Sequence, residues 1–251
     1  METGKAIRQH QILARDKRTF IIAIDQVIPR GLNTALSAYE ELLSHLFEYK
    51  FDALLMHSGP LKKYGTLIAR QRIPIILKLT TTTSFAKDRT NRFQVDDVER
   101  AVSLGCSAVA ANLYVGVSEE IRMLEQFYEI SKACDQWGVP LVAMANPSPD
   151  FEFDHEQLAY VCRVAFELGA DIVKTDYSGS VESFQYVVSN SPIPIVVEES
   201  PYPVSREGTL STVREVVEAG GAGVMFGERV WSEHGSSELV QNIYELIHRR
   251  H

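Results

Sequence analysis

A lysine stands inside an apolar segment that otherwise has the composition of a buried strand. Lys174 follows Ile172 and Val173 in the run GADIVKTDY, residues 169–177. Lysine is rarely buried, because its ammonium group loses hydration, and that loss favours the neutral amine. A neutral amine can attack a carbonyl carbon to form a Schiff base, and the iminium withdraws electrons from the adjacent C–C bond. The residue type and its place are therefore compatible with a nucleophile for making or breaking C–C bonds.

A second lysine, Lys78, lies in a similar apolar run, PIILKLT at residues 74–80. If both amines face one interior, the charge of either lowers the pKa of the other. The alternative for Lys174 is a structural role, in which it pairs with a carboxylate such as Asp25 or Asp176. The residue types alone leave both interpretations open, and they do not decide which lysine would be the nucleophile.

Eight short apolar runs alternate with segments of helical periodicity. The runs are continuous rather than strictly alternating, as expected for parallel strands covered on both faces. The predicted strands are residues 20–25, 53–58, 74–80, 108–115, 140–146, 171–177, 194–200 and 223–228. Without a linker, eight such units predict one α/β domain over residues 1–251, a (β/α)8 TIM barrel with an extra N-terminal helix (1–17) at its bottom. An open doubly wound sheet is the alternative, although no glycine-rich dinucleotide fingerprint follows the first run.

Local signals indicate where several helices begin and end. Asp154 with Gln157 has the pattern of a capping box, and Ser118 and Ser180 each precede acidic residues as N-caps do. Glycine follows three predicted helices four residues before a valine, at Gly105, Gly169 and Gly220. Glycine there can adopt the left-handed conformation that turns a helix into the next strand. These signals support regular strand–helix units.

Polar residues gather where the predicted strands end, which is where barrels of this kind carry their active sites. The candidates are Asp25, His57, Lys78, Asn112, Tyr114, Asn146, Lys174, Asp176, Glu199, Ser200, Gly227 and Arg229. Asp25 is placed for proton transfer, for holding substrate hydroxyls, or for a salt bridge with Lys174. His57 is either an acid/base group or a hydrogen-bonded wall residue. The threonines at 80–83 are expected in a loop that directs hydroxyls toward substrate or backbone.

Composition narrows the class of protein. The 251 residues carry a formal net charge of -8 with no basic stripe, which argues against nucleic acid as a partner. No stretch approaches the roughly 18 apolar residues of a membrane span, and no basic amphipathic helix indicates a membrane surface. The three cysteines lack metal-ligand spacing and are typical of reduced core residues in a cytoplasmic protein. A small-molecule carbonyl compound is the expected partner.

Three stretches carry a family resemblance: FIIAIDQVIPRG near the start, ELGADIVKTDYSGSVESF in the middle and EAGGAGVMFGERVW near the end. They resemble the class I aldolases of the deoxyribose-phosphate aldolase-like superfamily. The most similar branch holds archaeal-type fructose-bisphosphate aldolases, aminodideoxyheptulosonate synthases and the autoinducer-2 thiolase. The resemblance implies a barrel without metal or cofactor, aldol chemistry in carbohydrate metabolism, and a homo-oligomer. It places the Schiff-base lysine at Lys174 and the strand-end aspartate at Asp25.

The sequence departs from that family where the acid/base tyrosine is expected. The matching position, before the proline that ends the fifth strand, is Asn146. An asparagine amide cannot carry a proton at neutral pH. Tyr114, on the neighbouring strand, stands where the family usually has a smaller polar residue. We expect Tyr114 to take over proton transfer or to fill the space left by the shorter side chain.

The phosphate-binding positions are also altered. The family holds phosphate with a glycine pair after the seventh strand and a Gly-Arg after the eighth, whose backbone N–H groups face the anion. Here Glu199-Ser200 replaces the glycine pair, and the last strand ends Gly227-Glu228-Arg229. Carboxylates repel a bound phosphate. The expected substrate therefore lacks phosphate at this position, and an uncharged polyol or an amine fits better.

Three functions are compatible with these residues. The first is an aldolase-type lyase that uses the Lys174 Schiff base. The second is a transferase of acyl or ketol units on the same lysine, as the thiolase relative suggests. The third is a barrel that binds a sugar without reaction, since its tyrosine is lost. Covalent trapping on Lys174 separates the first two from the third.

Overall fold

Eight parallel strands close into a barrel in the computed structural model, which describes residues 2–151, 153–200, 202, 204–231 and 237–249. The order around the ring is β1-β10-β9-β8-β7-β6-β3-β2. The strands are β1 (Thr19–Ala23), β2 (Ala53–Met56), β3 (Ile75–Lys78), β6 (Ala108–Val115), β7 (Leu141–Pro147), β8 (Ile172–Thr175), β9 (Ile195–Glu198) and β10 (Gly223–Phe226). The TIM barrel prediction is confirmed. Six of the strands end two residues before their predicted ends, so most of the polar candidates lie at or just past the strand termini.

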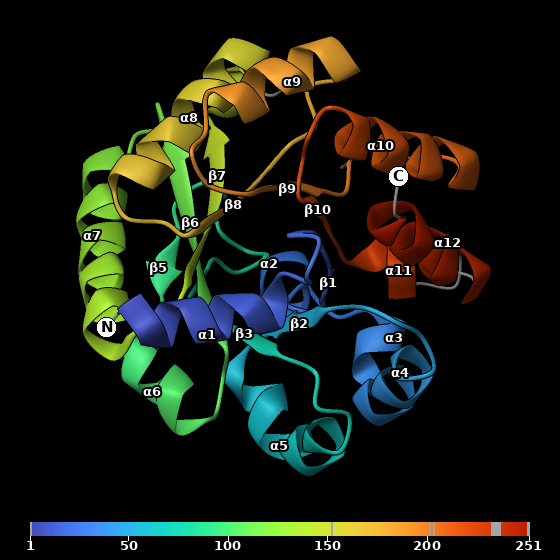
Figure 1. Cartoon of the computed structure of the whole chain (residues 1–251). Helices are drawn as coiled ribbons and strands as arrows, with labels where there is room; N and C mark the ends of the chain where they lie inside the picture. Colours follow the sequence, from blue (N-terminus) through green and yellow to red (C-terminus); the bar gives the residue numbers. More distant parts are fainter. Residues whose placement is uncertain (1, 152, 201, 203, 232–236, 250–251) are drawn as a thin grey trace.

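Helices cover the outside of the barrel (Figure 1). They are α1 (Glu2–Ile12), α2 (Val27–Arg30), α3 (Thr34–Ser37), α4 (Tyr39–Leu46), α5 (Ser58–Ala69), α6 (Val98–Ser103), α7 (Glu120–Trp137), the 3₁₀ helix η1 (Pro149–Phe151), α8 (His155–Glu167), α9 (Val181–Ser189), α10 (Arg206–Glu218), α11 (Glu228–Trp231) and α12 (Ser237–His248). Among the described residues, none of these helices is both long and apolar enough to cross a membrane.

Helix α1 closes the amino-terminal end of the barrel, as predicted. Ile12 at its end is fully buried and packs with the side chains that fill the barrel interior. Lys5 forms an ion pair with Asp171, just before β8, at 3.0 Å. Gln11 accepts a hydrogen bond from Ser107, just before β6, at 2.8 Å. In Figure 1 this helix lies across the end of the strand ring.

The interior of the barrel explains which side chains reach its carboxyl end. The inward residues form their own apolar cluster, and the last of these in seven of the strands are Ala23, Leu55, Ile76, Ala110, Met144, Ile172 and Val196. Because side chains alternate along a strand, the residue two places further on faces the same interior. Those residues are Asp25, His57, Lys78, Asn112, Asn146, Lys174 and Glu198. The alternation of the strands thus directs a layer of polar side chains to one end.

Most of the predicted helix boundaries are confirmed. Asp154 caps α8 by accepting from the backbone of Gln157, and Ser180 caps α9 through a capping box with Ser183. The prediction for Ser118 is wrong, because α7 begins at Glu120 without a side-chain cap. The Ser118 hydroxyl instead donates to Asp88, 3.3 Å away on a loop. The three predicted glycine turns all have positive φ, at Gly105 (75°), Gly169 (90°) and Gly220 (89°).

A small hairpin, absent from the prediction, stands beside the barrel opening. Thr80–Thr81 is a short strand, β4, that pairs antiparallel with β5 (Phe93–Gln94). The threonine run was expected in a loop, and that expectation is wrong for its first two residues. Strands of two residues leave no periodic pattern in a sequence. The hairpin holds the intervening loop, which carries Arg89 and Arg92.

Candidate active site

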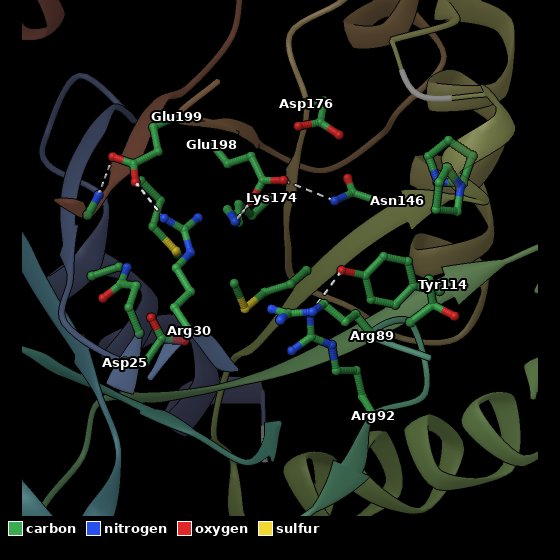
Figure 2. A pocket seen from close by; sticks show the side chains of 18 residues that line it. Asp25, Arg30, Arg89, Arg92, Tyr114, Asn146, Lys174, Asp176, Glu198 and Glu199 are labelled. Atoms are coloured by element: carbon green, nitrogen blue, oxygen red, sulfur yellow. Dashed lines mark hydrogen bonds and ion pairs between the residues drawn. The ribbon is translucent and has the colours of Figure 1, made fainter. Parts of the chain in front are cut away.

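A cavity of about 260 Å³ opens at the carboxyl ends of the strands (Figure 2). Seven predicted site residues line it, namely Asp25, Tyr114, Asn146, Lys174, Asp176, Glu199 and Gly227. An adjoining cavity of about 220 Å³ reaches Lys78 and Asn112. The structure therefore brings nine of the twelve predicted residues to one connected site.

The other three predicted residues lie elsewhere. Ser200 and Arg229 line a neighbouring cavity of about 390 Å³, which shares Asp176 and Glu198 with the first. His57 lines none of these three cavities. Burial lowers its pKa, and the charge of Asp25 only partly opposes that effect. His57 is therefore neutral at pH 7 and fits the role of a wall residue.

Lys174 extends from β8 into the middle of the cavity. It is buried, and its ammonium group forms an ion pair with Glu198 of β9. Burial lowers the pKa of Lys174 to about 8, while the charges of Asp176 and Asp25 oppose that change. Its ion-pair partner is thus a carboxylate that the sequence analysis had not considered for this role. The lowered pKa leaves roughly a tenth of the amine neutral at pH 7, far more than for an ordinary lysine.

Lys78 extends from β3 below the same cavity. It is 3% exposed and donates to the Asn112 Oδ1 atom at 2.8 Å, with the Met144 sulfur as a second contact. Burial lowers the pKa of Lys78 to about 7, and the charges of Arg92 and Lys174 lower it further. The two lysines do share one interior. Lys78 is packed against neutral groups, whereas Lys174 faces the larger cavity.

Asn146 holds Glu198 in place. Its Nδ2 atom donates to Glu198 at 3.0 Å, and its Oδ1 atom accepts from the hydroxyl of Thr175 at 3.1 Å. These contacts fix the orientation of the amide. Glu198 therefore bridges Asn146 and Lys174, beside the position where the family resemblance placed a tyrosine. The signal that could have identified Glu198 is its spacing, two residues after the interior residue Val196.

Glu199 accepts hydrogen bonds from backbone N–H groups just after β10. Its carboxylate accepts from Gly227 at 3.0 Å, from Glu228 at 3.1 Å and from Arg229 at 3.1 Å. Arg30 lies 3.9 Å from the same carboxylate and 3.1 Å from Glu228. The N–H groups that the resemblance assigned to phosphate are therefore used by an internal carboxylate.

Tyr114 faces a pair of arginines that the sequence analysis missed. Its hydroxyl lies 3.4 Å from a terminal nitrogen of Arg92, whose guanidinium lies 5.7 Å from the centre of the ring. Arg89 and Thr90 line the cavity beside them. All three come from the loop of the β4–β5 hairpin. The search for polar residues at the ends of barrel strands does not cover such a loop, so the sequence pattern did not identify these three residues.

Residues 19–233 match the DeoC/LacD family of aldolases. The chain is 30% identical over 234 residues to 2-amino-4,5-dihydroxy-6-oxo-7-(phosphonooxy)heptanoate synthase of Streptomyces griseus, covering 92% of this chain and 85% of that protein. It is also 30% identical over 248 residues to 2-amino-3,7-dideoxy-D-threo-hept-6-ulosonate synthase 1 of Archaeoglobus fulgidus, covering 98% and 91%. A Schiff-base-forming fructose-1,6-bisphosphate aldolase superposes with a TM-score of 0.89 at 29% identity, covering 97% of this chain and 100% of that one.

The fold and the matches define a class I aldolase, a lyase that makes or breaks a C–C bond through a Schiff base. The chain belongs to the DeoC/LacD aldolase family. Neither the transferase nor the non-catalytic barrel is favoured by these relatives. In the part of the chain that the structure describes, no group of three or more His, Cys, Asp or Glu side chains could hold a metal ion.

Proposed function

We propose that Lys174 forms the Schiff base with a carbonyl substrate that carries no phosphate at the β9–β10 end of the cavity. The absence of phosphate from the substrate is supported by the Glu199 carboxylate, which accepts hydrogen bonds from three backbone N–H groups. A phosphate there would lose these donors and would face a negative charge. At 4 Å each such pair costs about 1 to 4 kcal/mol between water-like and surface-like dielectric.

The position of Lys174 supports its role as nucleophile. Its neutral amine attacks the carbonyl carbon, a C–N bond forms, and the carbonyl oxygen takes up a proton. The resulting carbinolamine loses water to give the iminium, which accepts the electron pair of the breaking C–C bond. In synthesis the same steps run in reverse. Lys78 lies deeper, where it donates to Asn112 and where the charge of Lys174 adds to the effect of burial in lowering the pKa of Lys78.

Proton transfer needs a group that touches the reacting atoms. We assign it to Glu198, because this carboxylate contacts the Lys174 amine and is held by Asn146. Asp25 raises the pKa of both lysines through its charge, and it lines the cavity where substrate hydroxyls would lie. Tyr114 remains a second candidate for proton transfer, with its hydroxyl 3.4 Å from Arg92.

Borohydride trapping tests the proposal. The protein is incubated with dihydroxyacetone or with dihydroxyacetone phosphate, reduced, and digested for mass spectrometry. We expect an adduct on Lys174 and no adduct in Lys174→Ala. The wild-type protein should show no preference for the phosphorylated ketone, whereas Glu199→Gly should gain a preference of about tenfold or more, because its N–H groups are freed.

Glu228→Gln is the matched control, since it removes a nearby negative charge without freeing the N–H groups that Glu199 occupies. It should leave the preference unchanged. Two results would contradict the proposal: an adduct on Lys78 in place of Lys174, or a wild-type protein that cleaves fructose 1,6-bisphosphate at an ordinary enzymatic rate.

A further inference from the structure

The cavity of about 390 Å³ beside the catalytic one, called the side cavity here, takes no part in the proposed Schiff-base chemistry. It meets the catalytic cavity at Asp176 and Glu198, which line both. In Figure 2 these two carboxylates lie near Lys174, on the side away from Asp25. A substrate held at Lys174 can therefore extend a substituent past Glu198 toward the side cavity.

Aromatic and aliphatic side chains from separate segments form the walls of the side cavity. They are Phe153 before α8, Tyr177 after β8, Tyr202 and Val204 between β9 and α10, and Phe226 at the end of β10. Phe226 is buried and Tyr202 is exposed, so the cavity extends from the core to the solvent. Small-molecule sites are typically lined in this way and have volumes of about 300 to 1000 Å³. The side cavity therefore has the size and the walls of a binding site.

The backbone of Phe153 adopts an unusual conformation at the wall of this cavity. Its φ is 67°, in the left-handed region that glycine favours and that bulky residues rarely adopt. The centre of its ring lies 6.1 Å from that of Tyr202, on the loop between β9 and α10. Residues held in sparsely populated conformations cluster at ligand sites, because the conformation persists only where its surroundings fix it. The conformation of Phe153 is thus a second observation, independent of the cavity volume, that points to a ligand.

Several polar side chains of the side cavity are already engaged by other groups of the protein. The hydroxyl of Tyr177 donates to Glu215 at 2.6 Å. Arg229 donates to the backbone oxygens of Ser200 at 2.9 Å and Tyr202 at 3.2 Å, so that its guanidinium group holds the loop after β9. A polar ligand would have to compete for these groups, whereas an apolar ligand leaves their hydrogen bonds intact.

We propose that the side cavity binds an apolar substituent of the substrate, about the size of an aromatic ring. This inference rests on the proposed Schiff-base function and adds the class of carbonyl compound. An apolar cavity of roughly 150 Å³ is enough to bind benzene, so the side cavity has room for a ring and for the carbon that joins it to the carbonyl. The rings of Phe153 and Tyr202 would add aromatic contacts. A chain of hydroxyl groups would instead lose hydration against these walls.

A pair of aldehydes tests this site by borohydride trapping on Lys174. Phenylacetaldehyde carries the ring, and acetaldehyde lacks it. The concentration for half-maximal trapping on the wild-type protein should be about tenfold or more lower for phenylacetaldehyde, because its ring passes from water into an apolar cavity.

Two pairs of variants identify the walls responsible. Phe153→Ala and Tyr202→Ala should each raise the half-maximal concentration for phenylacetaldehyde about three- to tenfold and leave that for acetaldehyde unchanged. Phe151→Ala and Tyr160→Ala are the matched controls and should change neither value. Tyr160 matches Tyr202 in exposure, at 58% against 59%, and neither control residue lines the side cavity.

Binding without reaction separates this inference from the Schiff-base proposal. Phenethyl alcohol has the ring but no carbonyl, and its binding to Lys174→Ala is measured by saturation-transfer NMR against ethanol. We expect it to bind in preference to ethanol and to weaken about threefold or more when Phe153→Ala is added.

Equal trapping of the two aldehydes would overturn the apolar subsite, and so would a loss in Phe151→Ala as large as that in Phe153→Ala. If neither aldehyde is trapped, the Schiff base is refuted and the alcohol decides the subsite. A preference for phenethyl alcohol that depends on Phe153 would then support it, and the absence of such a preference would overturn it.

Discussion

At the scale of single residues, the proposed mechanism has Glu198 and Asn146 together replace the tyrosine that the family resemblance leads us to expect. We propose that Glu198 exchanges the proton and that Asn146 orients Glu198. Asn146 is fixed by Thr175 and holds one oxygen of Glu198, whose other oxygen contacts Lys174. The departure from the family pattern is thus compatible with retained acid/base chemistry.

Glu198→Gln tests this assignment through the rate and its pH dependence. Loss of a positioned acid/base group typically lowers turnover by about 10²–10⁴-fold, while the Lys174 adduct should still be trapped. Wild-type turnover should rise with pH through about 8, because only the neutral amine of Lys174 is a nucleophile. Removing the negative charge beside Lys174 lowers its pKa further, so the midpoint in Glu198→Gln should move to lower pH.

Tyr114→Phe is the companion variant, since it tests the other candidate for proton transfer. We expect it to change turnover much less than Glu198→Gln does. If Tyr114→Phe lowers turnover more than Glu198→Gln does, and the pH midpoint of Glu198→Gln is unchanged, the acid/base group is Tyr114.

At the scale of elements, helix α1 completes the barrel by closing its amino-terminal end. Ile12 is fully buried among the interior side chains, whereas Ile7 in the same helix is 60% exposed. Ile12→Ala should lower the free energy of unfolding by about 2 to 5 kcal/mol, because it leaves a cavity in a closed space. Ile7→Ala should change it by less than about 0.5 kcal/mol. Chemical denaturation measures both, and equal effects would show that α1 does not close the barrel in solution.

At the scale of the whole molecule, the barrel joins the two ends of the sequence. Strand β1 pairs with β10, so that Thr19 lies opposite Gly223 and Ile22 opposite Phe226. The interior cluster takes residues from both halves of the chain, among them Ile21 and Val196. We therefore predict one cooperative unfolding transition for the single domain, with coincident midpoints by circular dichroism and tryptophan fluorescence. Two separated transitions would contradict it. The cytoplasmic location and the homo-oligomeric state stay predictions.

Much of the fold could be predicted because it is local in the sequence. Apolar runs, helix periodicity and glycine turns each depend on neighbouring residues, and so the eight strands and the caps at Asp154 and Ser180 were found. The cap predicted at Ser118 is wrong because α7 begins at Glu120, and the Ser118 hydroxyl donates instead to Asp88 of a distant loop. The β4–β5 hairpin was missed because two residues carry no period.

The sequence by itself determined the polar layer at the barrel end, since strand alternation carries Lys78, Lys174 and Asp25 inward whatever the loops do. Only the tertiary structure decided their partners. Glu198 contacts Lys174 because β8 and β9 are adjacent in the ring. Glu199 reaches the N–H groups after β10 because β9 and β10 are adjacent as well. These contacts depend on strand order and loop position, which arise from long-range packing and leave no local periodicity. The lysine and the carboxylate of Glu199 could be found from the sequence, whereas the contacts that hold them could not.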